Sequence, residues 1–268
     1  LGTKKNILNM ERNDLESFYK KYYIPSNTCI SISGSVPKNI ISILNNIFGE
    51  VQNKKLIDHK YTDINFSDIE RPLIYCKNRK QNQIFVGLGF PIFGYYNSKK
   101  NYVDVLIEIL YGNMTSRLWL ALRELNPIVY GMSVDQELFE EGGMFSITLS
   151  YDKKNTNKTF QILAHELNKI KKKMVSKKEL NMIIDNMITS LEMEDDDNID
   201  IDKFYGEQIL LNSNIINFKK LKNIYKKTTP KIINQLANEI FDFNKVTLIQ
   251  VGNLGKSTFE KTYSKYFL

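Results

Sequence analysis

Cysteine and histidine are scarce in this sequence, which has two of each among 268 residues. Cys29 and Cys76 lie far apart without metal-site spacing, so we expect two buried, reduced thiols. His165 precedes a glutamate, but position 169 is lysine, so "HELNK" does not form an HExxH zinc motif. The sequence also lacks a phosphate-binding glycine loop and a Ser/His/Asp set. It therefore predicts no catalytic residue and no metal ligand that would make this chain a complete enzyme.

Long hydrophobic runs are missing as well. No stretch reaches the roughly 18 apolar residues of a membrane span, and the start "LGTKK" lacks the apolar core of a signal peptide. Because residue 1 is leucine and not methionine, this start says little about targeting of the natural protein. We expect a soluble protein of the cytoplasm or an organellar matrix, with no membrane partner.

Acidic residues are outnumbered, with 30 Asp and Glu against 37 Lys and Arg, a net charge of +7. This excess makes a basic nucleic-acid-binding module one hypothesis. The lysines are spread out, however, and the densest run, 168–179, is typical of a helix end, a turn and a helix start. No aromatic residues interleave with the charge, which disfavours nucleic acid as a partner. With 42% hydrophobic residues, the chain can build a core for one large domain or two unequal units.

The first fifty residues predict a helix, a strand and a second helix. Residues 13–23 place apolar side chains at helical spacing, 28–34 alternate like a strand that ends at a glycine, and 37–49 begin with proline and end with glycine. Residues 51–70 are polar and aperiodic and predict a linker.

The remainder predicts a mixed α and β domain. The acidic stretch 192–202 is typical of a solvated loop between helices. The endings "ISISG" and "LIQVGN" form a weak internal echo. Periodicity predicts strands at 72–77, 82–93, 128–139, 144–151 and 245–253, and helices at 98–112, 116–125, 156–174, 176–194, 199–212, 216–226 and 229–241.

The stretch "SRLWLALRELNPIVYGMS" (116–133) carries the most informative pair of residues. Trp119 and Arg123 are four apart and share a face of the predicted helix. Asn126-Pro127 breaks this helix, and Tyr130 lies near the start of the next strand. Spacing alone favours a structural interpretation, in which Arg123 pairs with an acid or stacks on Trp119 and Tyr130 packs within the strand.

Several segments in order resemble the pitrilysin/insulinase-type (M16) family of zinc metallopeptidases, and most closely its mitochondrial processing peptidase-like members. The resemblance covers most of the chain, which is similar to the C-terminal portion of such a peptidase. It rests on "DLESFYKKYYIPSNTCISISGSV", "FPIF" with the following helix, "SRLWLALRELNPIVYGMS", "EEGGMFSITLSYD" and "MVSKKELNMIIDNMITSLE".

The resemblance implies an α+β fold with an antiparallel-rich sheet covered by helices. Residues 1–50 would be the end of a first M16-like domain, 51–70 a linker and 71–268 a second M16-like domain. In the family, HxxEH and a downstream glutamate of the first domain bind zinc, and the second domain can contribute an arginine and a tyrosine to substrate. Arg123 and Tyr130 match that pair. This sequence lacks HxxEH, which is expected upstream of Leu1 or on a partner subunit.

The resemblance therefore implies the substrate-binding portion of a zinc endopeptidase that acts on extended peptides. Zinc is expected in the complete enzyme but not bound by this chain, which we expect to be inactive alone. The expected partners are a peptide substrate and an HxxEH-bearing domain or subunit, in a homodimer or heterodimer. One alternative is a non-catalytic scaffold or assembly subunit of the same family, and another is the nucleic-acid-binding module.

Overall fold

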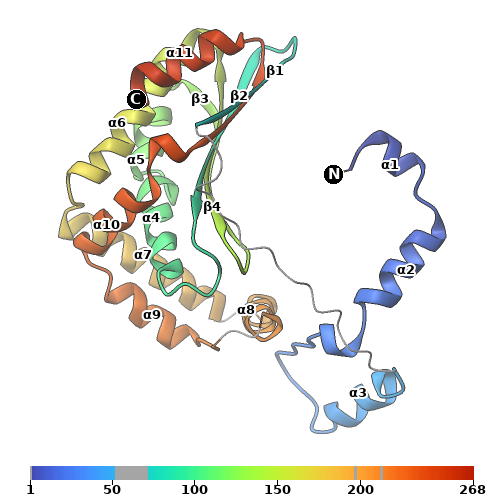
Figure 1. Cartoon of the computed structure of the whole chain (residues 1–268). Coiled ribbons are helices and arrows are strands. Elements are labelled where there is room, and N and C mark those ends of the chain that lie inside the picture. Colours follow the sequence, from blue (N-terminus) through green and yellow to red (C-terminus); the bar gives the residue numbers. More distant parts are fainter. Residues whose placement is uncertain (1, 52–71, 196–197, 212–213) are drawn as a thin grey trace. The chain divides into compact units, whose positions relative to one another are not determined.

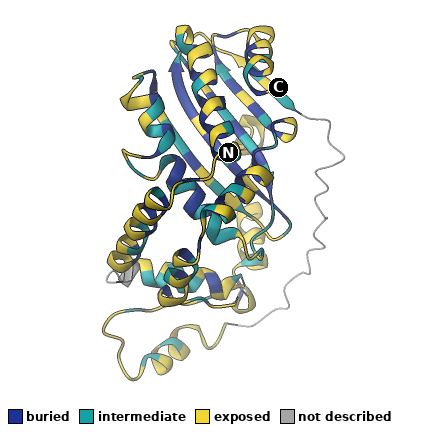
Figure 2. Ribbon diagram, turned by 90° about the vertical axis from the view of Figure 1, so that its left-hand side faces the viewer, coloured by how far each residue is buried: buried dark blue, intermediate teal, exposed yellow. Residues whose placement is uncertain are grey.

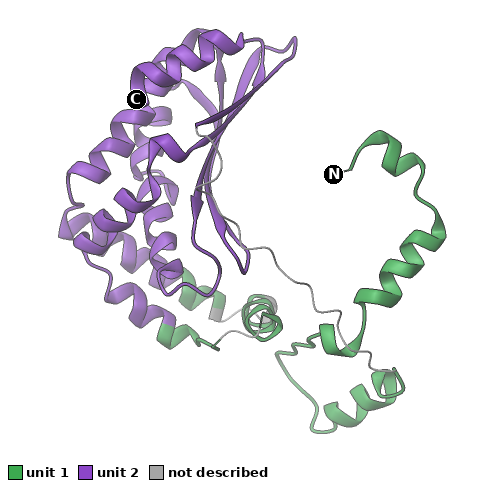
Figure 3. Cartoon of the chain, in the orientation of Figure 1, with its two compact units in different colours: residues 1–60, 190–220 green, residues 61–189, 221–268 purple. Residues whose placement is uncertain are grey.

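A computed structural model describes residues 2–51, 72–195, 198–211 and 214–268 of the chain. The chain divides into two compact units (Figure 3): residues 1–60 with 190–220, and residues 61–189 with 221–268. Of the linker predicted at 51–70, the structure describes only Val51. The rest of this segment, which includes His59, lies outside the described residues. The proposed domain limits at 50 and 70 therefore stay a prediction.

The second unit contains a five-stranded sheet, which confirms the predicted α+β class (Figure 1). The strand order is β1-β5-β2-β4-β3, and only the β1–β5 pair is parallel among the described strands. Each strand lies within about two residues of a predicted one. The strands are β1 (Leu73–Asn78), β2 (Gln83–Ile92), β3 (Val129–Leu138), β4 (Gly143–Asp152) and β5 (Thr247–Gly252).

Helices cover one face of this sheet, and their contact forms the core (Figures 1 and 2). In β4, Phe145, Ile147, Leu149 and Tyr151 are all buried, as the predicted alternation requires. α4 buries residues on several sides, which explains its nearly continuous apolar sequence. The helices of this unit include α4 (Lys100–Tyr111), α6 (Thr156–Lys172), α10 (Pro230–Ile240) and α11 (Lys256–Phe267), with most of α7 (Lys177–Asp195) and of α9 (Phe218–Lys226).

A buried carboxylate links three elements of this core. Asp104 of α4 accepts hydrogen bonds from Gln136 Nε2 of β3 and from the Tyr225 hydroxyl of α9. Burial raises the pKa of Asp104 to about 6, although these hydrogen bonds act in the opposite direction. The folded protein therefore binds the Asp104 proton more tightly than the unfolded chain does.

Asp104 is expected to make stability depend on pH. Its pKa is raised in the folded state, so its contribution is fully present below the usual value of 3.8 and is lost as pH rises through about 6. The loss should approach about 3 kcal/mol, at about 1.4 kcal/mol for each pKa unit. Denaturant unfolding of the wild type and of Asp104→Asn at several pH values isolates this effect. Parallel stability curves for the two proteins would contradict it.

The first unit contains short helices whose apolar side chains are largely uncovered. Within residues 2–51, Ile24 alone is buried, while Leu15 and Phe18 are more than half exposed. Its elements are α1 (Lys4–Leu8), α2 (Arg12–Tyr22), the 3-10 turn η1 (Pro25–Asn27), α3 (Ile40–Phe48) and α8 (Asn198–Leu210), with the end of α7 and the start of α9.

The strand predicted at 28–34 does not form. The alternating pattern is present, but a strand needs a neighbouring strand to satisfy its backbone groups. The described residues of this unit provide none. The stretch therefore runs as irregular chain up to Gly34, which has a positive φ of 97°.

The weak echo seen in the sequence corresponds to a structural repeat. The helices α2 and α10 both have 11 residues and are followed by 3-10 turns, Pro25–Asn27 and Phe243–Lys245. Both segments then reach a positive-φ glycine, Gly34 and Gly252. Helix starts, turn starts and glycines are each separated by the same 218 residues. Residues 12–34 thus repeat the helix, the 3-10 turn and the positive-φ glycine of 230–252, but not the strand β5.

Burial differs sharply between the two copies of this repeat. Phe18 and Tyr23 are 58% and 64% exposed, whereas their counterparts Leu236 and Phe241 are 3% and 0% exposed. In the second copy, β5 lies between two strands and α10 packs against α4 and α6. The first copy has apolar residues at the same positions, but no described strand or helix covers them as in the second copy.

Other sequence predictions have mixed outcomes. Cys29 and Cys76 are free, as predicted, but both are half-buried and not fully buried. The acidic loop predicted at 192–202 is wrong at its ends, because α7 continues to Asp195 and α8 begins at Asn198. None of the described helices has the length and apolar character needed to cross a membrane.

Candidate functional site

Arg123 lies in a π-helical turn. The short helix α5 (Arg117–Trp119) continues directly into η3 (Leu120–Glu124), which is π-helical. The amide of Leu125 donates to the carbonyl of Leu120, five residues earlier, at 2.9 Å. A π-turn holds one residue more than an α-turn and is frequent at functional sites. Hydrophobic periodicity predicts the helix but cannot reveal this extra residue.

Buried residues fix both ends of the connection between this turn and β3. Leu118 and Leu122 are fully buried before it, and Ile128 is buried after it. The side chain of Asn126 donates to the carbonyl of Ala121 at 3.0 Å and closes the helix end. The connection is therefore anchored, and Arg123 projects from it on the exposed side.

Arg123 stacks on the only tryptophan of the sequence. Its Cζ lies 4.4 Å from the centroid of the Trp119 ring, as the spacing of four predicted. Trp119 Nε1 donates to Glu124 Oε1 at 2.9 Å, which orients the ring. Among the described residues, Arg123 has no ion-pair or hydrogen-bond partner. An exposed stack of this kind contributes about 0.5–1 kcal/mol, so it holds the guanidinium while leaving its N–H groups available.

Tyr130 occupies a β-bulge at the start of β3. Val129 is paired with Tyr151 and Gly131 with Ser150, so Tyr130 has no partner residue in β4. Its side chain is 56% exposed, which contradicts the alternative that it packs within the strand. The hydroxyl donates to Asp152 Oδ2 at 3.0 Å, and this bond raises the pKa of Tyr130. Bulges of this kind re-aim a side chain.

The two residues thus flank one anchored turn, each at a backbone irregularity that exposes it. In the part of the chain that the structure describes, no hydrogen bond or ion pair joins Arg123 to Tyr130. Both carry donors at neutral pH: Arg123 a permanently charged guanidinium, and Tyr130 a phenol whose single O–H is donated to Asp152. Together they can present N–H and O–H groups to carbonyl or carboxylate oxygens.

Gly131, the residue after Tyr130, lines a hollow on the open face of the sheet, opposite to the face that the described helices of this unit cover. This hollow has a volume of about 470 Å³. Phe85 and Ile249, each about half exposed, flank it, and two glycines, Gly87 and Gly131, form part of its floor. A glycine in a central strand allows close approach of another backbone. No sequence pattern indicates this surface, because it depends on which strands are neighbours.

No metal centre is found among the described residues, where no three His, Cys, Asp or Glu side chains could hold an ion together. His165 lies on α6 with its side chain 70% exposed, 3.8 Å from the adjacent Glu166. This agrees with its interpretation as an ordinary helix residue. The donor set of the described residues therefore does not fit zinc.

Comparison with protein families and curated proteins gives consistent matches. A family model described as the peptidase M16 inactive domain matches residues 9–187, more than half of the chain. An uncharacterized zinc protease of Bacillus subtilis strain 168, YmxG, is 22% identical over 269 residues. An uncharacterized zinc protease of Rickettsia bellii is 25% identical over 260 residues. These alignments cover 98% and 93% of this chain and 59% of each relative.

Solved structures share the fold. A protease from Helicobacter pylori has a TM-score of 0.81 at 18% identity, and a peptidase M16 inactive domain from Pseudomonas fluorescens has 0.77 at 16%. The matches cover 93% and 95% of this chain and 61% and 60% of those chains. This chain thus spans about three fifths of the length of these similar proteins.

Proposed function

Because this chain belongs to the M16 peptidase family and carries its inactive domain, we propose that it is the substrate-binding portion of a zinc metallopeptidase acting on extended peptides. The observation that carries this proposal is the pair of exposed donors, Arg123 and Tyr130, on either side of one anchored turn. The hollow on the open face of the sheet begins at Gly131, the residue after Tyr130. That the chain is most similar to the mitochondrial processing peptidase-like members of the family stays a prediction.

The role proposed for this chain is to bind and orient a peptide. Arg123 would donate to a peptide carbonyl from its stack on Trp119. The Tyr130 hydroxyl would exchange Asp152 for a peptide oxygen beside it. Such donors are most effective where negative charge develops on oxygen during peptide cleavage. Zinc and the groups that activate water would be held by residues outside this chain. No residue of this chain is proposed to bind zinc or to activate the attacking water.

The structural repeat supports the proposed partner. Residues 12–34 have the apolar pattern of 230–252 but are not covered by comparable elements. We propose that a further M16-like domain or subunit, which also carries HxxEH, supplies strands beside residues 29–34 and covers Phe18 and Tyr23. A non-catalytic scaffold subunit would need the same covering strands and helices, but neither HxxEH nor Arg123 and Tyr130.

The chain alone is expected to bind an unstructured peptide without cleaving it. A fluorescent peptide titrated with the chain should give saturable anisotropy, and mass spectrometry after incubation with zinc should show the peptide intact. Gly87→Leu should weaken binding by about tenfold, equivalent to about 1.4 kcal/mol. A Cβ at position 87 would meet only Thr148 Cγ2, at 4.0 Å, so the new side chain can enter the hollow without disturbing the sheet.

Gln161→Leu is the matched control for this test, because it adds the same side chain at an exposed position of α6, away from the open sheet face. It should leave peptide binding unchanged. Equal binding by the wild type and Gly87→Leu would contradict a peptide site in the hollow. Zinc-dependent cleavage by the chain alone would contradict the assignment of the zinc site to a partner.

A further inference from the structure

A second hollow lies beside the π-turn, among the helices of the second unit. Its volume is about 430 Å³, within the range of small-molecule sites. It is formed between the α5–η3 segment, the end of α6 and the start of α7. Its lining residues are Thr115, Arg117, Leu120, Ala121, Leu125, Glu166, Lys169, Lys173, Met174, Ser176 and Glu179.

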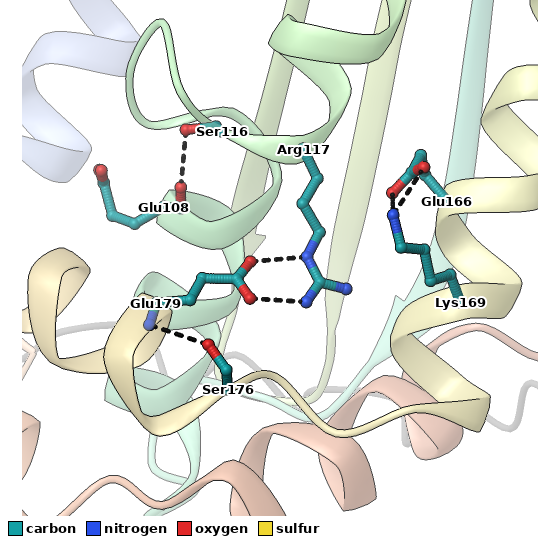
Figure 4. Close-up of polar contacts among 7 residues, drawn as sticks. All are labelled: Glu108, Ser116, Arg117, Glu166, Lys169, Ser176 and Glu179. Carbon is teal, nitrogen blue, oxygen red and sulfur yellow. Dashed lines mark hydrogen bonds and ion pairs between the residues drawn. The ribbon is translucent and has the colours of Figure 1, made fainter.

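Arg117 lines this hollow and carries a hydrogen-bond donor without a described acceptor just beneath its surface. Its Nε and Nη2 donate to the two carboxylate oxygens of Glu179 at 2.8 and 2.9 Å. Its Nη1 is buried and has no partner among the described residues. Figure 4 shows this third nitrogen directed away from Glu179. A buried guanidinium N–H group without an acceptor is costly, and an anionic acceptor would satisfy it best.

The charges around the hollow favour one negative charge. Arg117 and Glu179 neutralise each other, and Lys169 pairs with Glu166 at 3.2 Å (Figure 4). Lys173 also lines the hollow and has no ion pair within the described part of the chain. The lining therefore has a net charge of +1, which complements a monoanion.

The remaining wall is apolar, with Leu120, Ala121, Leu125 and Met174 facing the same space. We propose that this hollow binds a small apolar monocarboxylate. Its carboxylate would pair with Lys173 and, after a side-chain shift that uncovers it, accept from Arg117 Nη1. Its apolar body would lie on Leu120, Leu125 and Met174. Both a free organic acid and the C-terminal residue of a peptide carry this chemistry.

This site would communicate with the candidate substrate residues through the π-turn. The carbonyl of Leu120 and the amide of Leu125 form the defining π-type hydrogen bond, and Arg123 lies between them. A ligand that packs on these two leucines would therefore contact the turn that carries Arg123. The stack of Arg123 on Trp119 gives an intrinsic fluorescent reporter of such contact.

N-acetyl-L-leucine and its amide test the proposal, because they differ only in the charge at the carboxyl position. With methyl-labelled methionine, the acid should shift the NMR signal of Met174 saturably, and the amide should bind at least tenfold more weakly. Ala121→Leu fills the hollow without changing any charge and should abolish the shift. Arg117→Lys keeps the charge but loses the free Nη1 group, and should weaken binding severalfold.

Equal binding of acid and amide would overturn the proposal, and so would the absence of any Met174 shift at millimolar acid. Unchanged binding in Ala121→Leu would place the ligand elsewhere and also overturn it. N-acetyl-Gly-Gly-Leu distinguishes the two sources of the ligand. Binding of this peptide as tight as that of the free acid supports a peptide terminus, and binding of the free acid alone supports a small organic acid.

Discussion

Replacing Arg123 by glutamine in the complete, zinc-containing enzyme is expected to lower kcat by about 100-fold or more, a loss typical of a donor that stabilises developing oxyanion charge. Tyr130→Phe, which removes only the hydroxyl, should have an effect of similar kind. Both side chains are exposed and make one described contact each, so the free energy of unfolding should change by less than about 1 kcal/mol. Steady-state kinetics with a peptide substrate and denaturant unfolding measure the two effects separately.

Glu124→Gln is the matched control for Arg123→Gln. Glu124 lies on the same π-turn and holds Trp119 through one hydrogen bond, but it offers no donor to a substrate. Its replacement should change kcat by only a few fold. Equal losses in both variants would indicate that the turn acts as a structural element. Unchanged turnover in Arg123→Gln and Tyr130→Phe would remove both from the substrate site and favour the scaffold alternative.

Replacing Arg117 by alanine is expected to lower the free energy of unfolding by about 3 kcal/mol, the low end for breaking a buried ion pair. The side chains of Arg117 and Glu179 are only 13% and 29% exposed. Without the arginine, the Glu179 carboxylate would stay in a poorly solvated position, and α5 would lose its bidentate link to α7. Chemical denaturation followed by circular dichroism measures this loss.

The pair Lys99–Glu239 provides the comparison within the same protein. Its distance of 2.6 Å is shorter, but its side chains are 47% and 49% exposed. Lys99→Ala should therefore cost less than about 1 kcal/mol. A comparable loss in both variants would show that burial does not set the contribution of these ion pairs. A double replacement of Arg117 and Glu179 by methionine should recover most of the stability lost in Arg117→Ala, because no charge remains unpaired.

Local sequence patterns were sufficient to predict the strands and helices of the second unit. Alternation located β4, because each buried position follows from contact with one covered face. The repeated apolar spacing located α10 for the same reason. The prediction failed at residues 28–34, where the same alternation is present but no strand forms. A strand depends on a neighbour, and the pattern of one segment cannot show whether that neighbour exists.

The candidate site was predictable only in part. The spacing of Trp119 and Arg123 predicted their stack, which the structure shows. The π-turn around the buried Leu122 inserts one residue into the helix, and the bulge after Val129 inserts one residue into β3. Hydrophobic periodicity does not indicate either inserted residue. The hollows and the unsatisfied Nη1 of Arg117 arise from segments distant in sequence. Their detection required the assembled fold.

The most direct test of the central claim is the mass and zinc content of the species that contains this sequence, purified from its natural source. We expect a mass above the 31.3 kDa of this chain, close to one zinc per assembly, and an HxxEH motif in the additional polypeptide. A species of 31.3 kDa that cleaves peptides with zinc and no partner would contradict that claim. A larger species without HxxEH or zinc would contradict it as well.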